Sequence, residues 1–307
     1  MAHTCRERHR QLKQHIILEI RTIMNRNLFK LSIITLISST LGSCANSETA
    51  GNNNGNPAVA NAQGSATLNL VANGEDFVRQ GFVTKDGWTM NFDRLDVNLA
   101  EVTAYQMDGA FEPSETDTLD SIEPQETVSL VDTPQVIDLA KGEADAAPIL
   151  VTNAEVTPGF YNAMAWQVDT AGADSPLAGK TMVMQGTATK DERTINFDIS
   201  LDRPIQYLCG EYVGDERKGM VEAGSPGEIE TTFHFDHIFG DAETSPDEAI
   251  NVDALGFEPL AQLASNDSLT IDDATLTQQL SPEDQEKLTK AIIGLGHVGE
   301  GHCAVIE

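Results

Sequence analysis

Apolar and polar residues alternate along much of the chain between positions 66 and 201. This period of two is typical of β-strands with one buried face, and turn-forming stretches such as Lys85-Asp86-Gly87 separate the runs. We therefore expect strands at 66–72, 88–92, 95–105, 136–139, 161–168, 181–187 and 194–201. Short strands at this spacing, rich in β-branched and aromatic residues, predict a mainly-β fold, an antiparallel β-sandwich of the immunoglobulin or transthyretin kind.

Helical signals occur only late in the chain. Ser281 is a good N-cap, Pro282 suits the first helical position, and Gly294 is a stop signal after a partly apolar face. A shorter helix, interrupted by Pro259, is expected within 253–264, after an acidic loop at 241–251. The sandwich should thus carry a short helical C-terminal segment.

The N-terminal region carries an export signal. Residues 24–30 are basic, 31–41 are apolar, and Leu41-Gly42-Ser43-Cys44 follows. An apolar stretch of about eleven residues is too short to span a bilayer stably. The last four residues resemble the lipobox of bacterial lipoproteins, which implies that Cys44 is acylated and becomes the first residue of the mature protein. The alternative is an ordinary signal peptide followed by a coincidental cysteine.

These signals predict the organisation of the chain. Residues 1–23 look like an upstream extension, with Met24 the expected start, and 24–43 form the signal peptide. Residues 44–65, rich in Asn, Gly, Ala and Ser, read as a flexible tether, and 66–307 form the β-sandwich domain. The expected location is the cell envelope, outside the cytoplasm, with the protein attached to the membrane through lipid.

The net charge of the chain after the signal peptide restricts the kinds of partner to be expected. Residues 44–307 contain 12 basic and 46 acidic residues, a formal net charge of −34. Such a surface repels nucleic-acid phosphates and anionic lipid headgroups and attracts cations. We therefore expect no nucleic-acid partner and no membrane contact beyond the lipid anchor, and a membrane transporter or receptor is the partner class to consider.

Two cysteines remain after Cys44. In an exported protein Cys209 and Cys303 are most simply one disulfide, which would fix the C-terminal end of the chain to the middle of the domain. The competing interpretation is that both are thiolate ligands of a metal.

The middle of the chain resembles a known group of proteins. The stretches FDRLDVNLAEVTAYQ, VIDLAKG, PILV and VTPGFYNAMAWQVD occur in this order between residues 92 and 169. They are similar to an uncharacterised group of exported bacterial lipoproteins with a β-sandwich domain and, more distantly, to the periplasmic copper-binding proteins associated with methanobactin uptake. The resemblance implies the sandwich but transfers no ligand residues, because no histidine lies at a matching position.

Four histidines stand out because no other histidine follows residue 43. His234 and His237 lie in FHFDHIFGD, and His297 and His302 lie in GHVGEGHC. The alternation of Phe233 and Phe235 predicts a strand with His234 and Asp236 on the face opposite the phenylalanines. His237 would join His234 only through a bulge before Gly240, and a helical turn is not expected.

The second pair lies among closely spaced glycines, which let the backbone fold tightly so that side chains five apart converge. Imidazole is the commonest protein ligand of zinc and copper. The four histidines therefore predict a transition-metal site, with Asp236, Asp241 and Glu300 as additional ligands or as acceptors that orient the rings. Zinc is expected before copper, because Met182 and Met184 alternate like strand core. The alternative to a metal site is that the four histidines are ordinary hydrogen-bonded or surface residues.

Familiar enzyme motifs are missing from the sequence, including H-E-x-x-H and G-x-S-x-G. FHFDHIFGD is similar to a segment of copper–zinc superoxide dismutases, but its histidines are one residue further apart than in that family. The leading hypothesis is a lipid-anchored protein that captures or delivers a divalent metal. The alternative is a structural or interaction lipoprotein without metal, and a metalloenzyme with Glu300 as base comes third.

Overall fold

The computed structural model describes residues 65–306. The predicted extension and signal peptide, the lipid-bearing Cys44 and all but the last residue of the tether lie outside the described residues. No helix within 65–306 is long and apolar enough to cross a membrane.

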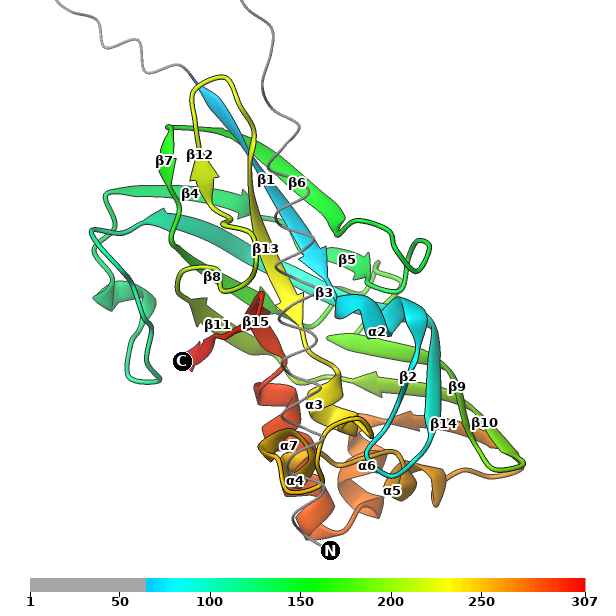
Figure 1. Ribbon diagram of the computed structural model, residues 1–307. Helices are drawn as coiled ribbons and strands as arrows, with labels where there is room; N and C mark the ends of the chain where they lie inside the picture. The colour runs from blue at the N-terminus through cyan, green and yellow to red at the C-terminus, as the bar shows by residue number, and fades with distance from the viewer. Residues whose placement is uncertain (1–64, 307) are drawn as a thin grey trace, which may run out of the picture. The chain divides into compact units, whose positions relative to one another are not determined.

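The described part of the chain is built mainly of strands (Figure 1). The strands are β1 (Ala66–Asn73), β2 (Phe82–Val83), β3 (Thr89–Gln106), β4 (Glu126–Val131), β5 (Gln135–Asp138), β6 (Ile149–Val156), β7 (Gly159–Phe160), β8 (Ala163–Val168), β9 (Met182–Lys190), β10 (Arg193–Leu201), β11 (Ile205–Cys209), β12 (Met220–Val221), β13 (Gly227–Phe233), β14 (Ser268–Asp272), β15 (Gly296–Val298), β16 (Gly301–His302) and β17 (Ala304–Ile306). The helices are α2 (Glu75–Gln80), the 3₁₀ helix η1 (Leu119–Ser121), α3 (Asp236–Phe239), α4 (Ala249–Asp253), α5 (Glu258–Ala261), α6 (Asp273–Gln279) and α7 (Pro282–Ile293).

Every strand expected from the alternating pattern is present. The runs at 88–92 and 95–105 join into the single long strand β3, which stays paired with β9 through an irregularity between Phe92 and Arg94. The helix predicted after Ser281 is α7, where the Ser281 hydroxyl accepts a hydrogen bond from the Asp284 backbone NH and Gly294 ends the helix. Of the helix expected within 253–264, only α5 is helical, because the chain breaks at Gly256 (φ 83°). The expected loop at 241–251 is wrong at its end, where α4 begins at Ala249.

The strands form a five-stranded and a ten-stranded sheet, with β7 and β12 as a separate pair. The five-stranded sheet has the order β16-β15-β13-β1-β6, and in the ten-stranded sheet β3 pairs with β2, β4, β5, β8 and β9. Pairing is antiparallel except for two parallel pairs, β1 with β13 and β10 with β14. Alternation gives the face of a strand but not the direction of its neighbour, so these two pairs could not be predicted from it.

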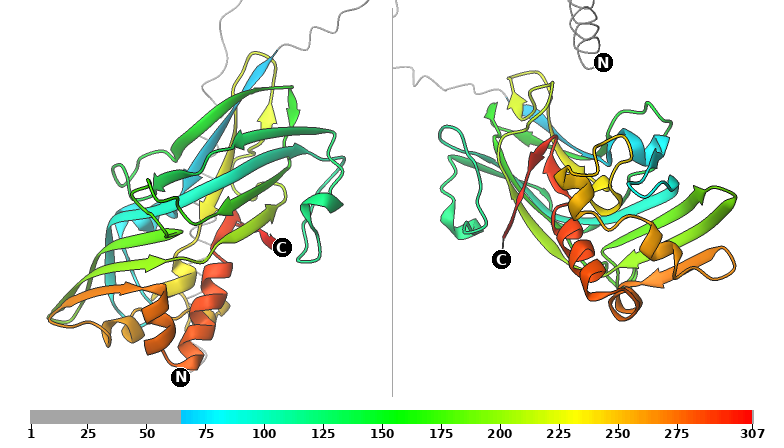
Figure 2. Two further views of the ribbon diagram at one scale, coloured as in Figure 1. Left: turned by 180° about the vertical axis from the view of Figure 1, so that it is seen from behind. Right: turned by 60° about the horizontal axis from the view of Figure 1, so that its bottom comes forward.

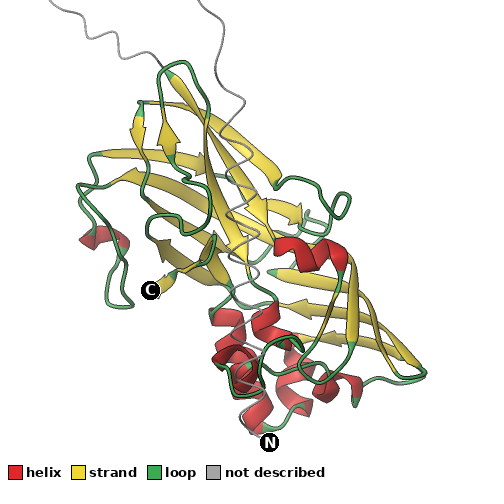
Figure 3. Cartoon of the chain, in the orientation of Figure 1, coloured by secondary structure: helices red, strands yellow, loops and turns green. Residues whose placement is uncertain are grey.

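A sandwich-like arrangement encloses the core (Figures 1 and 2). Leu68 and Leu70 of β1 and Phe233 of β13 share one buried cluster with Trp166 of β8 and Tyr207 of β11. The rings of Trp166 and Phe233 meet edge to face, with centroids 5.0 Å apart, so the two sheets pack directly on each other. Helices α3 to α7 gather at one end of the strands (Figure 3). The mainly-β, sandwich-like fold is confirmed.

Candidate metal centre

The parallel pairing of β1 and β13 brings together residues that lie far apart in the sequence. Asn73 lies opposite Thr232 in the register of the two strands. Parallel strands end at the same edge of a sheet, so the residues two positions further on, Glu75 and His234, become neighbours. The Glu75 Oε1 lies 3.6 Å from the His234 Nε2.

The histidine-bearing segment after β13 turns into a helix. The expectation of a strand through residue 236 is wrong, because β13 ends at Phe233 and α3 begins at Asp236. The turn lets both Phe233 and Phe235 enter the core, where both are fully buried, and the His237 backbone NH donates to the His234 carbonyl oxygen over 3.1 Å. His234 and His237 therefore face the same side, with ring centroids 5.7 Å apart.

The glycine-rich segment is a β-hairpin. Strand β15 pairs with β13, and β16 folds back so that His302 lies directly opposite His297, with ring centroids 4.2 Å apart. Gly299 makes the turn at φ 61°, and a Cβ there would lie 2.1 Å from the Val213 carbonyl oxygen. The prediction that the glycines let His297 and His302 converge is confirmed.

Cys209 and Cys303 form a disulfide with their Cα atoms 4.4 Å apart, as predicted. The bond occurs where the chain leaves β16 of the smaller sheet and enters β17 of the larger one. It therefore holds the outer strand of the hairpin next to β11, and the thiolate-ligand alternative is wrong.

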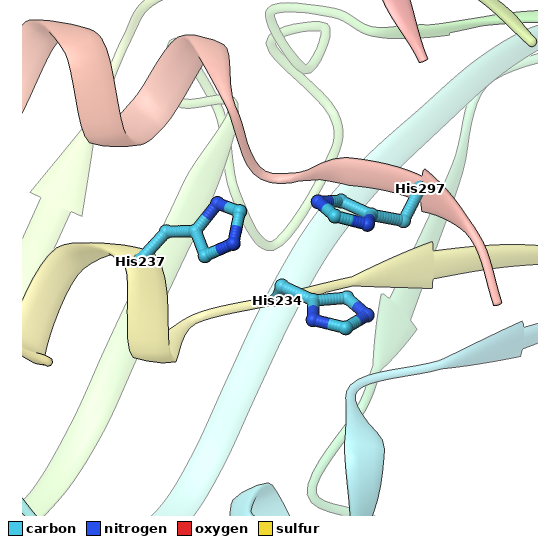
Figure 4. A group of neighbouring side chains, drawn as sticks. All are labelled: His234, His237 and His297. Atoms are coloured by element: carbon cyan, nitrogen blue, oxygen red, sulfur yellow. The ribbon is translucent and has the colours of Figure 1, made fainter. Parts of the chain in front are cut away.

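Three histidines form the core of the candidate site. One ring nitrogen from each of His234, His237 and His297 lies within 4.8 Å of the other two, a group that could hold a metal ion. In Figure 4, His237 of α3 and His297 of β15 point toward each other, and the His234 ring lies beside that of His297. The His234 and His297 rings are stacked with centroids 4.0 Å apart. His302 is exposed and flanks this group, with its ring centroid 5.6 Å from that of His237.

Backbone carbonyls fix which nitrogen of each ring carries a proton. The Gly294 carbonyl oxygen lies 2.8 Å from His237 Nδ1 and 3.2 Å from His297 Nε2, and the Gly299 carbonyl oxygen lies 3.2 Å from His234 Nε2. A carbonyl oxygen only accepts, so each of these nitrogens is the donor. The lone pairs that remain are on His234 Nδ1, His237 Nε2 and His297 Nδ1. Backbone acceptors orient metal-binding histidines in this way.

Two buried atoms in this cluster lack partners. Among residues 65–306, His297 Nδ1 and Asp236 Oδ1 are buried and make no hydrogen bond. The Asp236 Oδ1 lies 3.9 Å from His234 Nδ1, the nitrogen that carries no proton when His234 Nε2 donates to the Gly299 carbonyl oxygen, so these two acceptor atoms lie close together. Leaving buried polar atoms unpaired costs free energy, and a cation between such atoms would satisfy them.

Burial also sets the protonation of the site. It lowers the pKa of His297 to about 2, with further lowering by His234, His302 and His237. Burial likewise lowers the pKa of His237 and raises that of Asp236, although the neighbouring histidines act to lower the Asp236 value. His237 and His297 are therefore neutral at pH 7, which is the form of histidine that binds metals.

Two of the three proposed carboxylates lie outside the cluster. The Asp241 carboxylate accepts hydrogen bonds from the Thr244 hydroxyl and the Glu243 backbone NH, and so closes a turn. Glu300 is exposed at the hairpin turn and lines a pocket of about 380 Å³ together with Glu75, Glu230 and Lys218. Of the three carboxylates named from the sequence, only that of Asp236 lies beside a ring of the group, so the geometry does not support the suggestions for Asp241 and Glu300.

Glu75 is a further residue of the cluster that no sequence pattern predicts. Its backbone has a φ of 63°, unusual for a residue other than glycine, and its NH donates to the Asn73 side chain over 3.1 Å. Burial raises its pKa, while the His234 ring opposes that shift. Only the parallel register of β1 and β13 identifies this residue, and alternation in the sequence carries no signal for it.

Comparison with known proteins adds no relative, since no family model, no curated protein and no solved structure matches this chain. The assignment of a function therefore depends on the chemistry of the three histidines and their surroundings.

Proposed function

We propose that this protein is a lipid-anchored metal-binding protein of the cell envelope, which captures or delivers a divalent transition metal, zinc first and copper second. The observation that supports it is the set of three histidines whose protons are directed at backbone carbonyls, which leaves three lone pairs within one cluster. Tetrahedral zinc holds nitrogen ligands about 3.3 Å apart. One ring nitrogen of each histidine already lies within 4.8 Å of one from each of the others, so small side-chain rotations suffice to bring three nitrogens to that separation.

Zinc suits the donor set better than copper. Three nitrogens with a nearby carboxylate, that of Asp236, match the ligands zinc takes in proteins. Met182 and Met184 lie buried in strand β9, as expected for core residues, and so do not act as the soft ligands that favour copper(I). The acidic surface raises the local concentration of cations, which assists capture.

Localisation in the envelope is part of this proposal and depends on the lipobox-like sequence before Cys44. Cleavage and acylation there would leave the domain attached to the membrane by a short tether. Mass spectrometry of the protein isolated from membranes would find a diacylated or triacylated N-terminal cysteine at position 44. An unmodified N-terminus at another residue would contradict the anchor without affecting the metal site.

Metal content tests the function itself. The full-length protein, purified without a histidine tag and loaded with zinc, should retain about one ion per chain and melt several degrees higher than the same sample after chelation. His234→Ala should lose both effects, whereas Asp241→Asn, at a carboxylate outside the cluster, should keep them. Sub-stoichiometric metal after loading with either zinc or copper, together with an unchanged melting temperature, would reject the proposal.

A further inference from the structure

We infer that the metal centre has an open side that binds a small carboxylate with a short aliphatic chain. This inference rests on the proposed metal-binding function and adds a ligand class to it. It is drawn from the pocket beside His237 and His302, from the different burial of the three histidines, and from the contrast with the acidic pocket near Glu75.

The pocket has a volume of about 370 Å³, within the range of roughly 300–1,000 Å³ usual for small-molecule sites. It lies between α4, α7 and the two histidine segments. Its lining residues are His237, Ala249, Ile250, Asp253, Lys290, Ala291, Gly294 and His302.

The metal-binding group meets this pocket on one side only. His234 and His297 are buried, with 8% and 2% of their surface exposed, whereas His237 is half-buried and lines the pocket. Three nitrogens leave at least one coordination position of zinc free, and zinc also accepts a fifth ligand if Asp236 binds. The free position is therefore reached from the side where His237 and His302 line the pocket.

The apolar side chains that line the pocket favour a ligand with an aliphatic chain. Ile250 of α4 and Ala291 of α7 give the pocket an apolar surface next to its histidine end. A donor atom on the metal would therefore continue into an aliphatic chain of a few carbons that packs on these two residues. Acetate, which has only a methyl group, would leave most of this surface without contacts.

Charge selects an anion. A divalent ion with three neutral imidazoles keeps its positive charge. The Lys290 ammonium at the same pocket is paired with the Asp253 carboxylate, 2.7 Å away, so these two side chains offset each other and the charge that selects the ligand is that of the metal. A carboxylate compensates this charge, while an alkylammonium ion of the same length is repelled. The second pocket, on the Glu75 side of His234, is lined by Glu75, Glu230 and Glu300 and disfavours anions.

Cobalt(II) provides the test, because its visible absorption changes when its coordination changes. The full-length protein loaded with cobalt should show a saturable spectral change with hexanoate. Acetate should require at least a tenfold higher concentration, and hexan-1-ol and hexylammonium should have no effect. Equal concentrations for hexanoate and acetate would overturn the role of the pocket.

Variants on α4 localise the binding. Ile250→Trp fills the pocket and should abolish the response to hexanoate while cobalt still binds. Val252→Trp, at an exposed position on the same helix, should respond as the wild type does. Lys290→Met leaves the Asp253 carboxylate at the pocket without its ion pair and should weaken hexanoate binding several-fold. This variant decides the question if Ile250→Trp fails to fold.

The outcomes separate the two proposals. Cobalt that binds tightly but does not respond to hexanoate would overturn the inference and leave the metal-binding function intact. A hexanoate response retained in Ile250→Trp would also overturn it. Failure to bind cobalt, zinc or copper would reject the metal-binding function and the carboxylate site with it.

Discussion

The two segments that supply the histidines are held in different ways. The β13–α3 segment (residues 227–239) has neighbours on both sides, because β13 lies between β1 and β15 and its phenylalanines enter the core. The β15–β16 hairpin (residues 296–302) ends in the edge strand β16, which has two residues and pairs only with β15 within the described sheet. Its inner histidine, His297, is buried, and its outer one, His302, is exposed.

This difference divides the four histidines into unequal roles. A metal site needs ligands whose rings are fixed before the ion arrives, since fixed ligands lose little entropy on binding. His234, His237 and His297 meet that condition through their carbonyl partners. His302 makes no side-chain hydrogen bond within residues 65–306 and lines the pocket. The structure thus separates three histidines with oriented rings from one histidine that lines the pocket, and in the proposed metal site the first three are the ligands.

The largest expected effect compares the two histidines of the hairpin. His297→Ala should weaken zinc binding by more than about 100-fold, because it removes one of three oriented ligands. His302→Ala should weaken it by less than about tenfold. Competition titration with a chromophoric chelator measures both. Equal losses would show that His302 is a full ligand and would remove the distinction.

The disulfide gives the next largest effect and tests what holds the hairpin. Replacing Cys209 and Cys303 together by serine should lower the free energy of unfolding by about 2–4 kcal/mol, because the bond closes a loop between residues 94 positions apart. Zinc affinity should change far less, since β15 stays paired with β13. Urea unfolding and the zinc titration are compared with wild-type protein reduced by dithiothreitol. A loss of zinc affinity as large as that of His297→Ala would contradict the view that β13 positions His297.

The smallest expected effect concerns pH and the buried ring of His297. Its pKa falls from the ordinary value of 6.5 to about 2 on folding, so between these values the unfolded chain binds more protons than the folded one. The contribution of His297 to the free energy of unfolding is therefore complete above pH 6.5 and falls as the pH drops through this window, by about 1 kcal/mol per pH unit. The metal-free His297→Gln variant should show a correspondingly shallower loss between pH 6 and pH 4 in urea unfolding. Identical slopes would show that His297 is protonated in the folded state as well.

Local patterns in the sequence predicted much of the secondary structure. Alternation located β1, β3, β5 and β8 to β10, and the sequence from Ser281 to Gly294 located α7, because these elements depend on residues close in the chain. The pairing of β1 with β13 could not be predicted from the sequence, since it joins strands separated by more than a hundred residues and no turn connects them. Glu75 was missed for that reason.

The candidate site was partly readable. The density of glycines around His297 and His302 indicated a tight return of the chain, and the hairpin confirms it. The alternation of Phe233 and Phe235 predicted a strand through residue 236, which is wrong. Two apolar residues separated by one also enter a core when a strand ends in a helical turn. Asp241 was assigned by its closeness in sequence, whereas its side chain is occupied within its own turn.

The Gly294 carbonyl oxygen accepts from two rings and belongs to the residue that ends α7. One atom therefore couples the helix to both histidine segments. An ion that draws His237 and His297 together must shift or strengthen both hydrogen bonds at once, and the last turn of α7 experiences the change. Amide hydrogens near Lys290 and Gly294 should then exchange with solvent more slowly once metal is bound, so that the end of a helix reports the binding of an ion to which it offers no ligand.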